Sequence, residues 1–291
     1  MKQQISGKTG VLGVIGHPVA HTSSPAMHNA ALQALGLDYV YTAFTVPPAQ
    51  LGQAIAGMRA FQIRGLNVTV PHKVGVMAFL DEISPEARAI GAVNTIDNHE
   101  GYLVGHNTDA FGVMQSLRLD GGLETLPPQV ALLGAGGAAR AILYGLLQCP
   151  EVAHIALLNR TPEKAASLAI ALDPGQERVR PDVLDQSAGE QVAAAGLLIN
   201  ATAIGMHPHP EASPLPDPSC LHSGMVVLDI VYNPLETLLL TQARQAGARA
   251  VDGLGMLARQ GARAFEIWNG IEPPVEAMRT AALERLGKPP T

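Results

Sequence analysis

The feature that most restricts the fold of this chain is a repeated alternation of short apolar segments with longer segments of helical periodicity. The short segments are rich in β-branched residues and have the length of strands. In the first part of the chain, predicted strands cover 11–15, 39–46 and 66–70, and a predicted helix follows each, at 25–35, 49–58 and 73–80. This alternation is typical of βαβ units, whose strands form a mostly parallel sheet covered by helices.

The same rhythm returns in the second part of the chain. Strands are predicted over 130–133, 155–158, 196–200 and 225–231. Helices are predicted over 138–147, 162–172 and 235–246. A Gly- and Pro-rich break at 119–128 separates the two parts, and at 291 residues one core usually gives way to two domains. The sequence therefore predicts an α/β protein with two domains, an N-terminal, mostly parallel α/β sandwich and a Rossmann-type domain.

Charge and composition argue against several classes of protein. With 47% apolar residues the chain has ample material for two cores, and its net charge of −6 argues against nucleic-acid binding, which needs a basic surface. The two cysteines, Cys149 and Cys220, predict neither a disulfide framework nor a zinc site, and favour a reducing compartment. The N-terminal residues are polar and no apolar run is long enough to span a membrane, so the cytoplasm is the expected location.

One segment, residues 207–218, is so rich in proline that it is predicted to be irregular. It contains His207 and His209, which are possible metal ligands. A surface loop is the simpler interpretation, and no metal is predicted.

The strongest local signal is a glycine-rich turn between a predicted strand and a predicted helix. It has the form G-x-G-x-x-A, with Gly134, Gly136 and Ala139 at the three positions. The first glycine permits a tight turn, the second lets the backbone approach a pyrophosphate, and the alanine allows close packing of helix on strand. The phosphates would lie against free N–H groups at the helix N-terminus. The alternative is a turn that merely connects the two elements. The residues expected to contact a dinucleotide here are Gly134, Ala135, Gly136, Gly137 and Ala138.

The end of the next predicted strand indicates which dinucleotide is bound. An NAD site commonly carries Asp or Glu there, whereas this chain has Asn159-Arg160-Thr161. No carboxylate would repel a 2′-phosphate, and Arg160 offers charged donors to one. Thr161 before Pro162 is predicted to cap a helix whose N-terminus faces the same phosphate. We therefore predict NADP as the cofactor, with Lys164 nearby. The alternative is that Arg160 and Lys164 are ordinary surface charges. Enzymes that use S-adenosylmethionine commonly have an acid here, so Asn159 argues against them.

Hydroxyl groups precede the first predicted helix. Ser24 is followed by Pro25 and is predicted to be the N-cap. Thr22 and Ser24 at a helix N-terminus would also suit a small carboxylate, and the two roles are compatible.

Polar residues also interrupt the third predicted strand. Asn67 and Thr69 lie within an apolar run, and Lys73 falls in the first turn of the helix predicted to follow. A cation there opposes the helix dipole, which makes Lys73 a candidate for proton transfer rather than an ordinary surface charge. Asp109 is predicted either to cap a helix or to face Lys73 and share a proton with it.

Motifs spread in order over residues 11 to 270 resemble those of the shikimate dehydrogenase family. They are Val14-Ile-Gly16-His-Pro18, Thr22-Ser-Ser24-Pro25-x-x-His28-Asn29, Asn67-Val-Thr69-Val-Pro71-x-Lys73, Gly91-Ala-Val-Asn94-Thr95, Asn107-Thr108-Asp109 with Gly112, Gly134 to Arg140, Asn159-Arg160-Thr161, Asn200-Ala-Thr202-x-x-Gly205-Met206, Asp229-Ile-Val-Tyr232-Asn233-Pro234-Leu235 and Gly253-x-Gly255-Met256-Leu-x-x-Gln260. One such block would be weak evidence, whereas this many in register are specific.

The resemblance implies an oxidoreductase of aromatic amino acid biosynthesis that reversibly reduces 3-dehydroshikimate to shikimate with NADPH. It implies that residues 1–110 together with 253–291 form the catalytic domain and 111–252 the NADP-binding domain. Lys73 and Asp109 would be the acid–base pair. The implied substrate-binding residues are Thr22 and Ser24 for the carboxylate, Asn67, Thr69, Asn94 and Gln260 for ring hydroxyls, and Tyr232, which closes the pocket. Further implied cofactor contacts are Thr202, Val231, Gly253 and Met256.

Two residues depart from the family pattern. Thr22 stands where serine is usual, which leaves the preference between shikimate and quinate open, and His72 stands where Phe or Tyr is common. One alternative is a quinate/shikimate dehydrogenase, often linked to NAD, against which Asn159-Arg160-Thr161 argues. Another is a non-catalytic NADP-binding regulator, against which Lys73 and Asp109 argue. The expected partner is a small-molecule substrate, not nucleic acid or membrane, with the chain a monomer or a homodimer.

Overall fold

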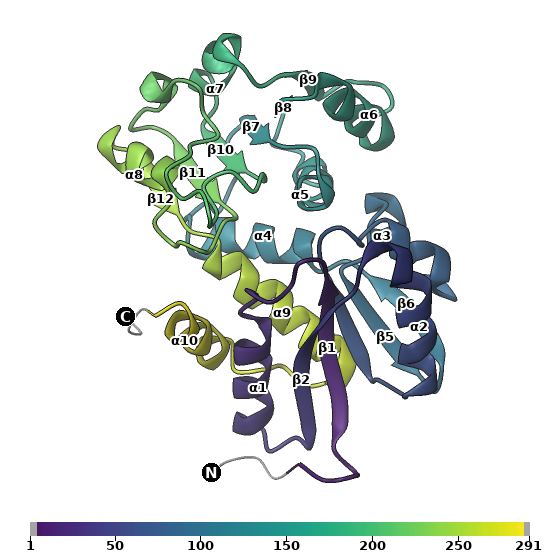
Figure 1. Cartoon of the computed structure of the whole chain (residues 1–291). Helices are drawn as coiled ribbons and strands as arrows, with labels where there is room; N and C mark the ends of the chain where they lie inside the picture. The colour runs from purple at the N-terminus through teal and green to yellow at the C-terminus, as the bar shows by residue number, and fades with distance from the viewer. Residues whose placement is uncertain (1–4, 288–291) are drawn as a thin grey trace. The chain divides into compact units, whose positions relative to one another are not determined.

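A computed structural model describes residues 5–287 of the chain and divides into two compact units (Figure 1). Unit 1 comprises the residues up to Asp109 together with those from Ala258 onward, and unit 2 comprises Ala110–Leu257. The sequence placed the domain boundaries between residues 110 and 111 and between 252 and 253. The two units of the structure are divided after Asp109 and after Leu257. The second division falls inside the long helix α9 (Leu254–Asn269).

Unit 1 is built on a six-stranded sheet in the order β2-β1-β3-β5-β6-β4. β1 pairs in parallel with β2 and β3, and β4 in parallel with β6, but β5 runs antiparallel to both of its neighbours. The sheet is therefore mixed at β5, a strand that was not predicted and that carries the buried polar residues Asp97 and Asn98. The strands are β1 (Gly10–Gly16), β2 (Tyr39–Thr45), β3 (Gly65–Val68), β4 (Glu82–Ile83), β5 (Thr95–His99) and β6 (Tyr102–His106).

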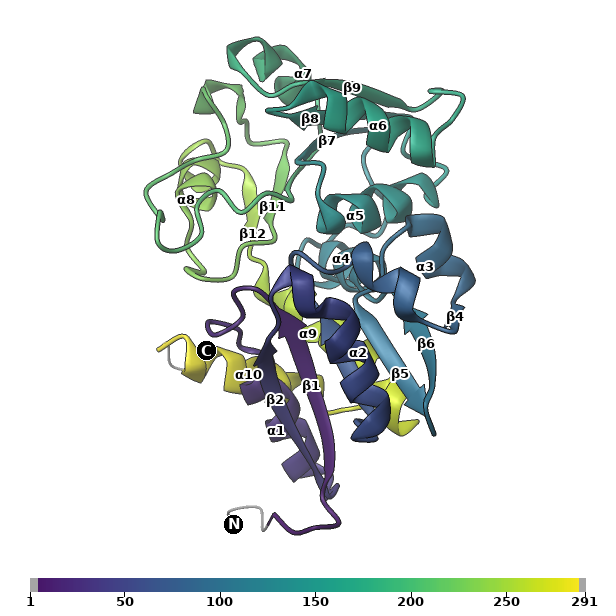
Figure 2. The same cartoon turned by 45° about the vertical axis from the view of Figure 1, so that its right-hand side comes forward.

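Helices cover both faces of this sheet. α1 and α10 pack side by side in both views (Figures 1 and 2). A core of residues from the strands, α2 and α3 fills the other face, with Ile55, Met58 and Leu66 fully buried. The helical elements are α1 (Ser24–Ala34), η1 (Pro48–Gln50), α2 (Leu51–Ala60), η2 (Gly75–Phe79), α3 (Pro85–Ile90), α9 and α10 (Val275–Arg285).

The α-helix expected at 73–80 is wrong. Only the short 3₁₀ helix η2 forms, and it begins after Lys73. The Lys73 carbonyl accepts a hydrogen bond of 2.8 Å from the N–H of Val93. Because this carbonyl is paired with another segment, it does not accept the hydrogen bond that an α-helical turn would require. Lys73 therefore lies in a turn after β3 rather than in the first turn of an α-helix.

Unit 2 is an all-parallel, six-stranded sheet in the order β12-β11-β10-β7-β8-β9, as expected for a Rossmann-type domain. Successive residues of β7 point to opposite faces: Leu132 enters one core and Leu133 the other. The strand order reverses beside β7, the place where such sheets bind ligands at the carboxyl ends of their strands. The elements are α4 (Asp109–Leu119), β7 (Gln129–Leu133), α5 (Gly137–Leu147), β8 (His154–Asn159), α6 (Pro162–Leu172), β9 (Val179–Val183), η3 (Gln186–Ala188), α7 (Gly189–Ala193), β10 (Leu197–Asn200), η4 (Pro218–Cys220), β11 (Val226–Asp229), α8 (Leu238–Gln245) and β12 (Arg249–Val251).

The Gly- and Pro-rich break at 119–128 does not separate the two units. It follows α4 inside unit 2, because α4 packs into the core of that unit through Val113 and Leu117. Residues 207–218 are irregular except for the start of η4, as predicted from their prolines. In the described part of the chain, no helix has both the length and the apolar character needed to cross a bilayer.

Candidate active site

The two residues predicted to exchange a proton lie in contact within unit 1. The Nζ atom of Lys73 donates to Oδ2 of Asp109 over 2.5 Å, and their side chains are 15% and 6% exposed. Asp109 is the first residue of α4, but its carboxylate oxygens contact Lys73 and Asn94, and its own N–H donates to Oδ1 of Asn107. The carboxylate thus serves the lysine rather than the helix end.

Asn94 fixes the second oxygen of this carboxylate. Its Nδ2 atom donates to Oδ1 of Asp109 over 2.8 Å and to Oε1 of Gln260 over 3.3 Å. Its Oδ1 atom accepts from the N–H of Thr108 over 2.8 Å. One polar cluster therefore joins Lys73 to Asn94, which precedes β5, to Thr108 and Asp109, which follow β6, and to Gln260 of α9. Thr108 was not predicted as a site residue, although it stands beside Asp109 in the sequence.

Asn67 belongs to a neighbouring buried network. Its Oδ1 atom accepts from the hydroxyl of Tyr41 over 2.7 Å, and its Nδ2 atom donates to Thr95 Oγ1 and to the carbonyl of Asn94. Burial raises the pKa of Tyr41 well above its ordinary value, so the phenol stays a donor. Sequence reasoning missed Tyr41. A buried tyrosine needs a partner for its hydroxyl, but burial within an apolar strand was the only signal.

The hydroxyl pair before α1 is present, with one correction. The N-cap is Ser23, and Ser24 is already the first helical residue. Thr22 Oγ1 donates to Ser24 Oγ over 3.0 Å and accepts from the Ser24 N–H, which holds the two hydroxyls together. Thr69 packs over Gly16, since a Cβ atom there would lie 2.5 Å from its methyl group. Thr69 directly follows the carboxyl end of β3, and Thr22 lies in the loop between β1 and α1.

His72, the second departure from the family pattern, has a packing role. Its side chain is 2% exposed, and Nε2 lies 2.7 Å from the carbonyl oxygen of Val46. The carbonyl can only accept, so Nε2 carries the proton.

In unit 2, the glycine-rich turn has the geometry that a bound pyrophosphate needs. Gly134 has φ +107°, and a Cβ there would lie 3.1 Å from the Ala201 carbonyl oxygen, so glycine is required. Gly136 is the N-cap of α5, and no described atom comes within 4 Å of a Cβ built on it. The first-turn N–H groups of α5, from Gly137 onward, have no acceptor inside the helix. This turn therefore fits a phosphate group at a helix N-terminus.

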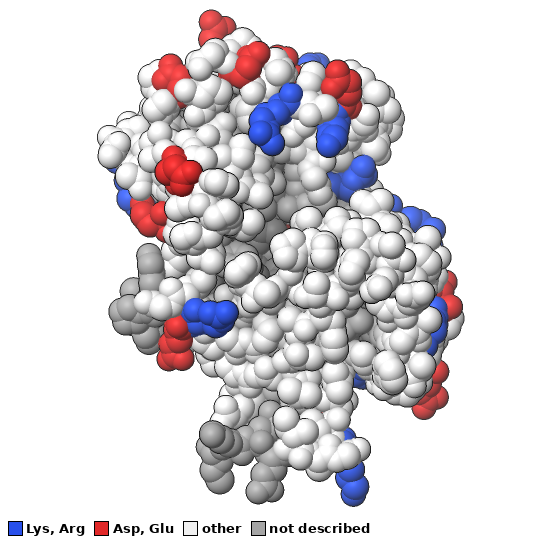
Figure 3. All heavy atoms as spheres, in the orientation of Figure 1, with Lys and Arg blue, Asp and Glu red and all other residues white. Residues whose placement is uncertain are grey.

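The residues predicted to select NADP follow β8. The side chain of Asn159 donates to the carbonyl oxygen of Thr161 over 2.8 Å, which shapes the turn. Thr161 is the N-cap of α6, as predicted, but within residues 5–287 its side chain makes no capping hydrogen bond. Arg160, Thr161 and Lys164 are exposed, and Figure 3 shows Lys and Arg side chains on the face of unit 2 near α6. This end of β8 fits a 2′-phosphate.

The other predicted cofactor residues follow β10, β11 and β12. Thr202 packs beside the glycine turn, 3.1 Å from a Cβ built on Gly134. Val231 is buried, and a Cβ on Gly253 would lie 2.3 Å from the Ile230 carbonyl oxygen, so only glycine fits there. Met256 is buried in one core of unit 2. Tyr232, the one predicted substrate residue in unit 2, is half-buried.

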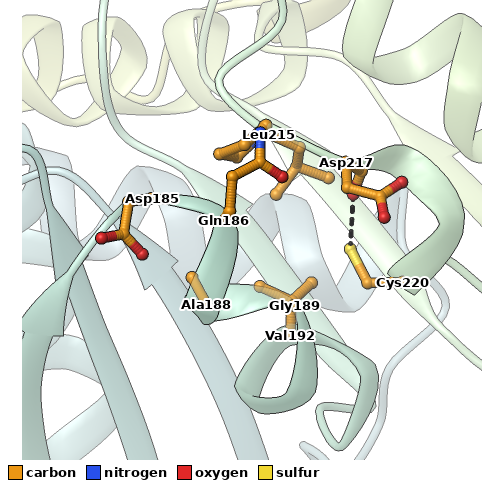
Figure 4. Close-up of a pocket in the computed structure, with 9 residues that line it drawn as sticks. Asp185, Gln186, Ala188, Gly189, Val192, Leu215, Asp217 and Cys220 are labelled. Atoms are coloured by element: carbon orange, nitrogen blue, oxygen red, sulfur yellow. Dashed lines mark hydrogen bonds between the residues drawn. The ribbon is translucent and has the colours of Figure 1, made fainter.

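A small pocket elsewhere in unit 2 contains none of the predicted site residues (Figure 4). It lies between η3 and η4, where Asp185 and Asp217 each accept from the N–H two residues ahead, at Ser187 and Ser219. The Cys220 thiol donates to the Asp217 carbonyl oxygen over 3.1 Å. These groups complete local turns. Among the described residues, no group of three His, Cys, Asp or Glu side chains is arranged to hold a metal ion, His207 and His209 included.

Comparison with known proteins assigns the chain to a family. Residues 14–96 match the shikimate dehydrogenase substrate-binding domain, and residues 253–283 match the shikimate 5′-dehydrogenase C-terminal domain. A relative from Symbiobacterium thermophilum, named shikimate dehydrogenase (NADP⁺), is 49% identical over 287 residues, covering 97% of each chain.

Solved structures agree with this assignment. A shikimate dehydrogenase in complex with NADP⁺ is 42% identical with a TM-score of 0.88, covering 98% of each chain. The shikimate 5-dehydrogenase of Thermus thermophilus, in complex with NADP(H) and shikimate, is 39% identical with a TM-score of 0.84, covering 95% of this chain and 99% of that one. A quinate dehydrogenase of Corynebacterium glutamicum in complex with NAD is 33% identical with a TM-score of 0.87 over 95% and 99% of the chains. The chain belongs to the shikimate dehydrogenase family.

Proposed function

We propose that this protein is an NADP-dependent shikimate dehydrogenase, which reversibly reduces 3-dehydroshikimate to shikimate in aromatic amino acid biosynthesis. The observation that carries the proposal is the contact between Lys73 and Asp109 inside a shielded polar cluster. Relatives that are named shikimate dehydrogenase (NADP⁺) and align over nearly the whole chain support the proposal.

NADPH, when bound, supplies the hydride that turns the carbonyl carbon into an alcohol carbon. Lys73 donates the proton to the oxygen of that carbon, and in the reverse direction it accepts the proton from the hydroxyl. An ammonium group has three donors, of which Asp109 uses one, so the others remain available to a substrate oxygen. Asp109 holds the ammonium in place and is itself held by Asn94, so the proton donor is already positioned before the substrate binds.

The remaining predicted substrate residues, which are polar, bind the substrate. Thr22 and Ser24 bind its carboxylate through hydroxyls at the start of α1. Asn67, Thr69, Asn94 and Gln260 bind ring hydroxyls, and Tyr232 supplies a further substrate contact. In unit 2, the glycine turn binds the pyrophosphate, and Arg160 and Thr161 with Lys164 bind the 2′-phosphate. Thr202, Val231, Gly253 and Met256 make further cofactor contacts, with Met256 near the nicotinamide.

Turnover of shikimate with NADP⁺, followed by NADPH absorbance, tests the proposal. Lys73→Ala should lower turnover by about 10² to 10⁴, the usual contribution of a positioned acid–base group, with shikimate affinity nearly unchanged. Arg59→Ala is the matched control. It removes a cation from an ion pair with Asp81 in the same unit and should keep turnover. An unmodified protein that binds NADP⁺ but does not oxidise shikimate would contradict the proposal and favour a binding protein.

A further inference from the structure

Asp229 is a buried carboxylate that plays no part in the chemistry of Lys73 and Asp109. It is the last residue of β11 and has no exposed surface. Its Oδ1 atom accepts from Asn200 Nδ2 over 2.9 Å and from the Val231 N–H over 3.0 Å, and its Oδ2 atom accepts from Thr237 Oγ1 over 2.8 Å. All three partners are neutral. Burying a carboxylate is costly unless it is hydrogen-bonded, and these three donors offset part of that cost.

The first consequence of this carboxylate concerns the loop after β10. A carboxylate accepts but does not donate, so Asn200 must turn its Nδ2 atom toward Asp229. The Oδ1 atom of Asn200 therefore points the other way, where it accepts from the N–H of Thr202 over 3.0 Å and from its hydroxyl over 2.7 Å. By orienting the side-chain amide of Asn200, Asp229 determines which atom of Asn200 accepts the hydrogen bonds of Thr202.

The second consequence concerns the loop after β11. Asp229 binds this loop near its start, at the Val231 N–H, and at its end, through Thr237, whose hydroxyl also caps α8 by accepting from Leu240 N–H. The N–H of Ile230 donates a hydrogen bond to the Asn200 carbonyl oxygen. The Ile230 carbonyl oxygen lies so close to Gly253 that no side chain fits there. One carboxylate thus ties together both loops at the carboxyl edge of β10 and β11.

We propose that Asp229 is a positioning residue for NADP(H), which holds the loops after β10 and β11 so that Thr202 and Val231 are placed to contact the cofactor. The inference rests on the proposed function, which assigns these two residues to the cofactor site. It adds a residue that itself touches neither cofactor nor substrate.

Calorimetric titration with NADP⁺ alone tests the proposal without relying on turnover. Asp229→Ala removes both acceptors and should raise the NADP⁺ Kd about tenfold or more, since several hydrogen bonds that preorganise the loops are lost. Asp229→Asn keeps an acceptor for Asn200 and Val231 and can donate to Thr237, so its Kd should stay within about threefold of the unmodified protein. Thr237→Val, which removes one of the contacts, should lie between them.

Asp173→Ala is the matched control within unit 2. Its carboxylate accepts from the N–H groups of Arg178 and Val179, next to the start of β9 rather than the carboxyl ends of the strands. This variant should lose thermal stability and keep the NADP⁺ Kd. Equal weakening by Asp173→Ala, or an unchanged Kd in folded Asp229→Ala, would overturn the proposal. If Asp229→Ala does not fold, Thr237→Val decides, because an unchanged Kd there also overturns it. An unmodified protein that does not bind NADP⁺ would instead contradict the proposed function.

Discussion

The hydroxyl of Tyr41 donates a hydrogen bond of 2.7 Å to Oδ1 of Asn67, and both side chains are buried in unit 1. This contact sets the orientation of the Asn67 amide, whose two N–H donors are directed at Thr95 Oγ1 and the Asn94 carbonyl oxygen. With both donors used, Asn67 has only the second lone pair of Oδ1 left for a ligand. Under the proposed function, a ring hydroxyl of the substrate binds Asn67, and we expect that hydroxyl to act as a donor.

Tyr41→Phe should therefore weaken substrate binding while sparing the chemistry. Without the phenol, Oδ1 of Asn67 is buried without its donor and the amide is free to turn, a loss of about 1 to 3 kcal/mol. We expect the KM for shikimate to rise about tenfold, with kcat and the KM for NADP⁺ nearly unchanged. Tyr102→Phe, in which an exposed hydroxyl near Glu82 is removed, is the control and should change none of these constants. Equal loss of kcat in Tyr41→Phe would show that Tyr41 acts on the proton-transfer pair instead.

Cofactor preference should depend on Arg160. One or two charge-assisted hydrogen bonds to the 2′-phosphate, at roughly 1.5 to 3 kcal/mol each, imply at least about a tenfold preference for NADP⁺ over NAD⁺. Arg160→Ala should raise the KM for NADP⁺ and leave that for shikimate nearly unchanged. Arg180→Ala, which removes another exposed arginine of unit 2, should have no such effect. Equal efficiency of the unmodified protein with both cofactors would make the assignment of Arg160 wrong.

Lys73 and Asp109 should behave as one unit in a double-mutant cycle. Asp109→Asn removes the charge that holds the ammonium and should lower turnover about as much as Lys73→Ala. The double variant should cost much less than the sum of the two losses, because each single change already disables the pair. Asp81→Asn, at the Arg59 ion pair, is the control for an aspartate lost from the same unit. Additive losses would mean that the two residues act independently.

The fold could be predicted wherever apolar periodicity decides it. Helix α6 covers the predicted residues 162–172, because a proline starts it and an apolar stripe continues it. The β5–β6 hairpin was missed, since β5 carries Asp97 and Asn98 facing the interior. Asp97 is compensated there by an ion pair with Arg64, a partner distant in sequence. Long-range compensation of this kind leaves no periodic signal in the chain.

The site could be predicted where the residue type itself carries the chemistry, as with Lys73, Asp109 and the glycine turn. What could not be predicted is how side chains are oriented. Nothing near Tyr41 in the sequence shows that its hydroxyl reaches Asn67, because the contact depends on the register of β1 with β2 and β3. The prediction that Lys73 opposes a helix dipole was wrong for a similar reason. The Lys73 carbonyl accepts a hydrogen bond from the N–H of Val93, a residue distant in sequence, so no α-helix begins there.

The stability of unit 2 should respond to the titration of Asp229. Burial raises the pKa of Asp229 from 3.8 to about 6, so the folded state favours the protonated form more than the unfolded state does. This contribution is fully present below about pH 4 and is lost as the pH rises through about 6, at up to about 3 kcal/mol. Asparagine does not titrate, so Asp229→Asn should gain stability relative to the unmodified protein between these pH values. Urea unfolding of both proteins across this range measures the difference, and a gap that does not change with pH would contradict the expectation.

The last prediction concerns Thr22, where the family usually has serine. Its hydroxyl bonds to both the Oγ and the N–H of Ser24, and fixing Oγ1 also fixes the methyl group, since both are attached to Cβ. Quinate differs from shikimate in its saturated ring and in an extra hydroxyl on the carbon that bears the carboxylate. If Thr22 binds that carboxylate, its methyl narrows the space for this hydroxyl and leaves it short of a partner.

One such misfit is worth roughly 1 to 3 kcal/mol, or about 10- to 200-fold in kcat/KM. We therefore expect strong preference for shikimate over quinate, and partial relaxation of that preference in Thr22→Ser, which keeps the bonds to Ser24 and removes only the methyl. Thr9→Ser, which removes the methyl of a half-buried threonine hydrogen-bonded to Asp38, is the control. The measurement is kcat/KM for both acids with each protein. If discrimination is the same in Thr22→Ser, the methyl points away from the carboxylate-bearing carbon, and the preference is set by residues that contact the rest of the ring.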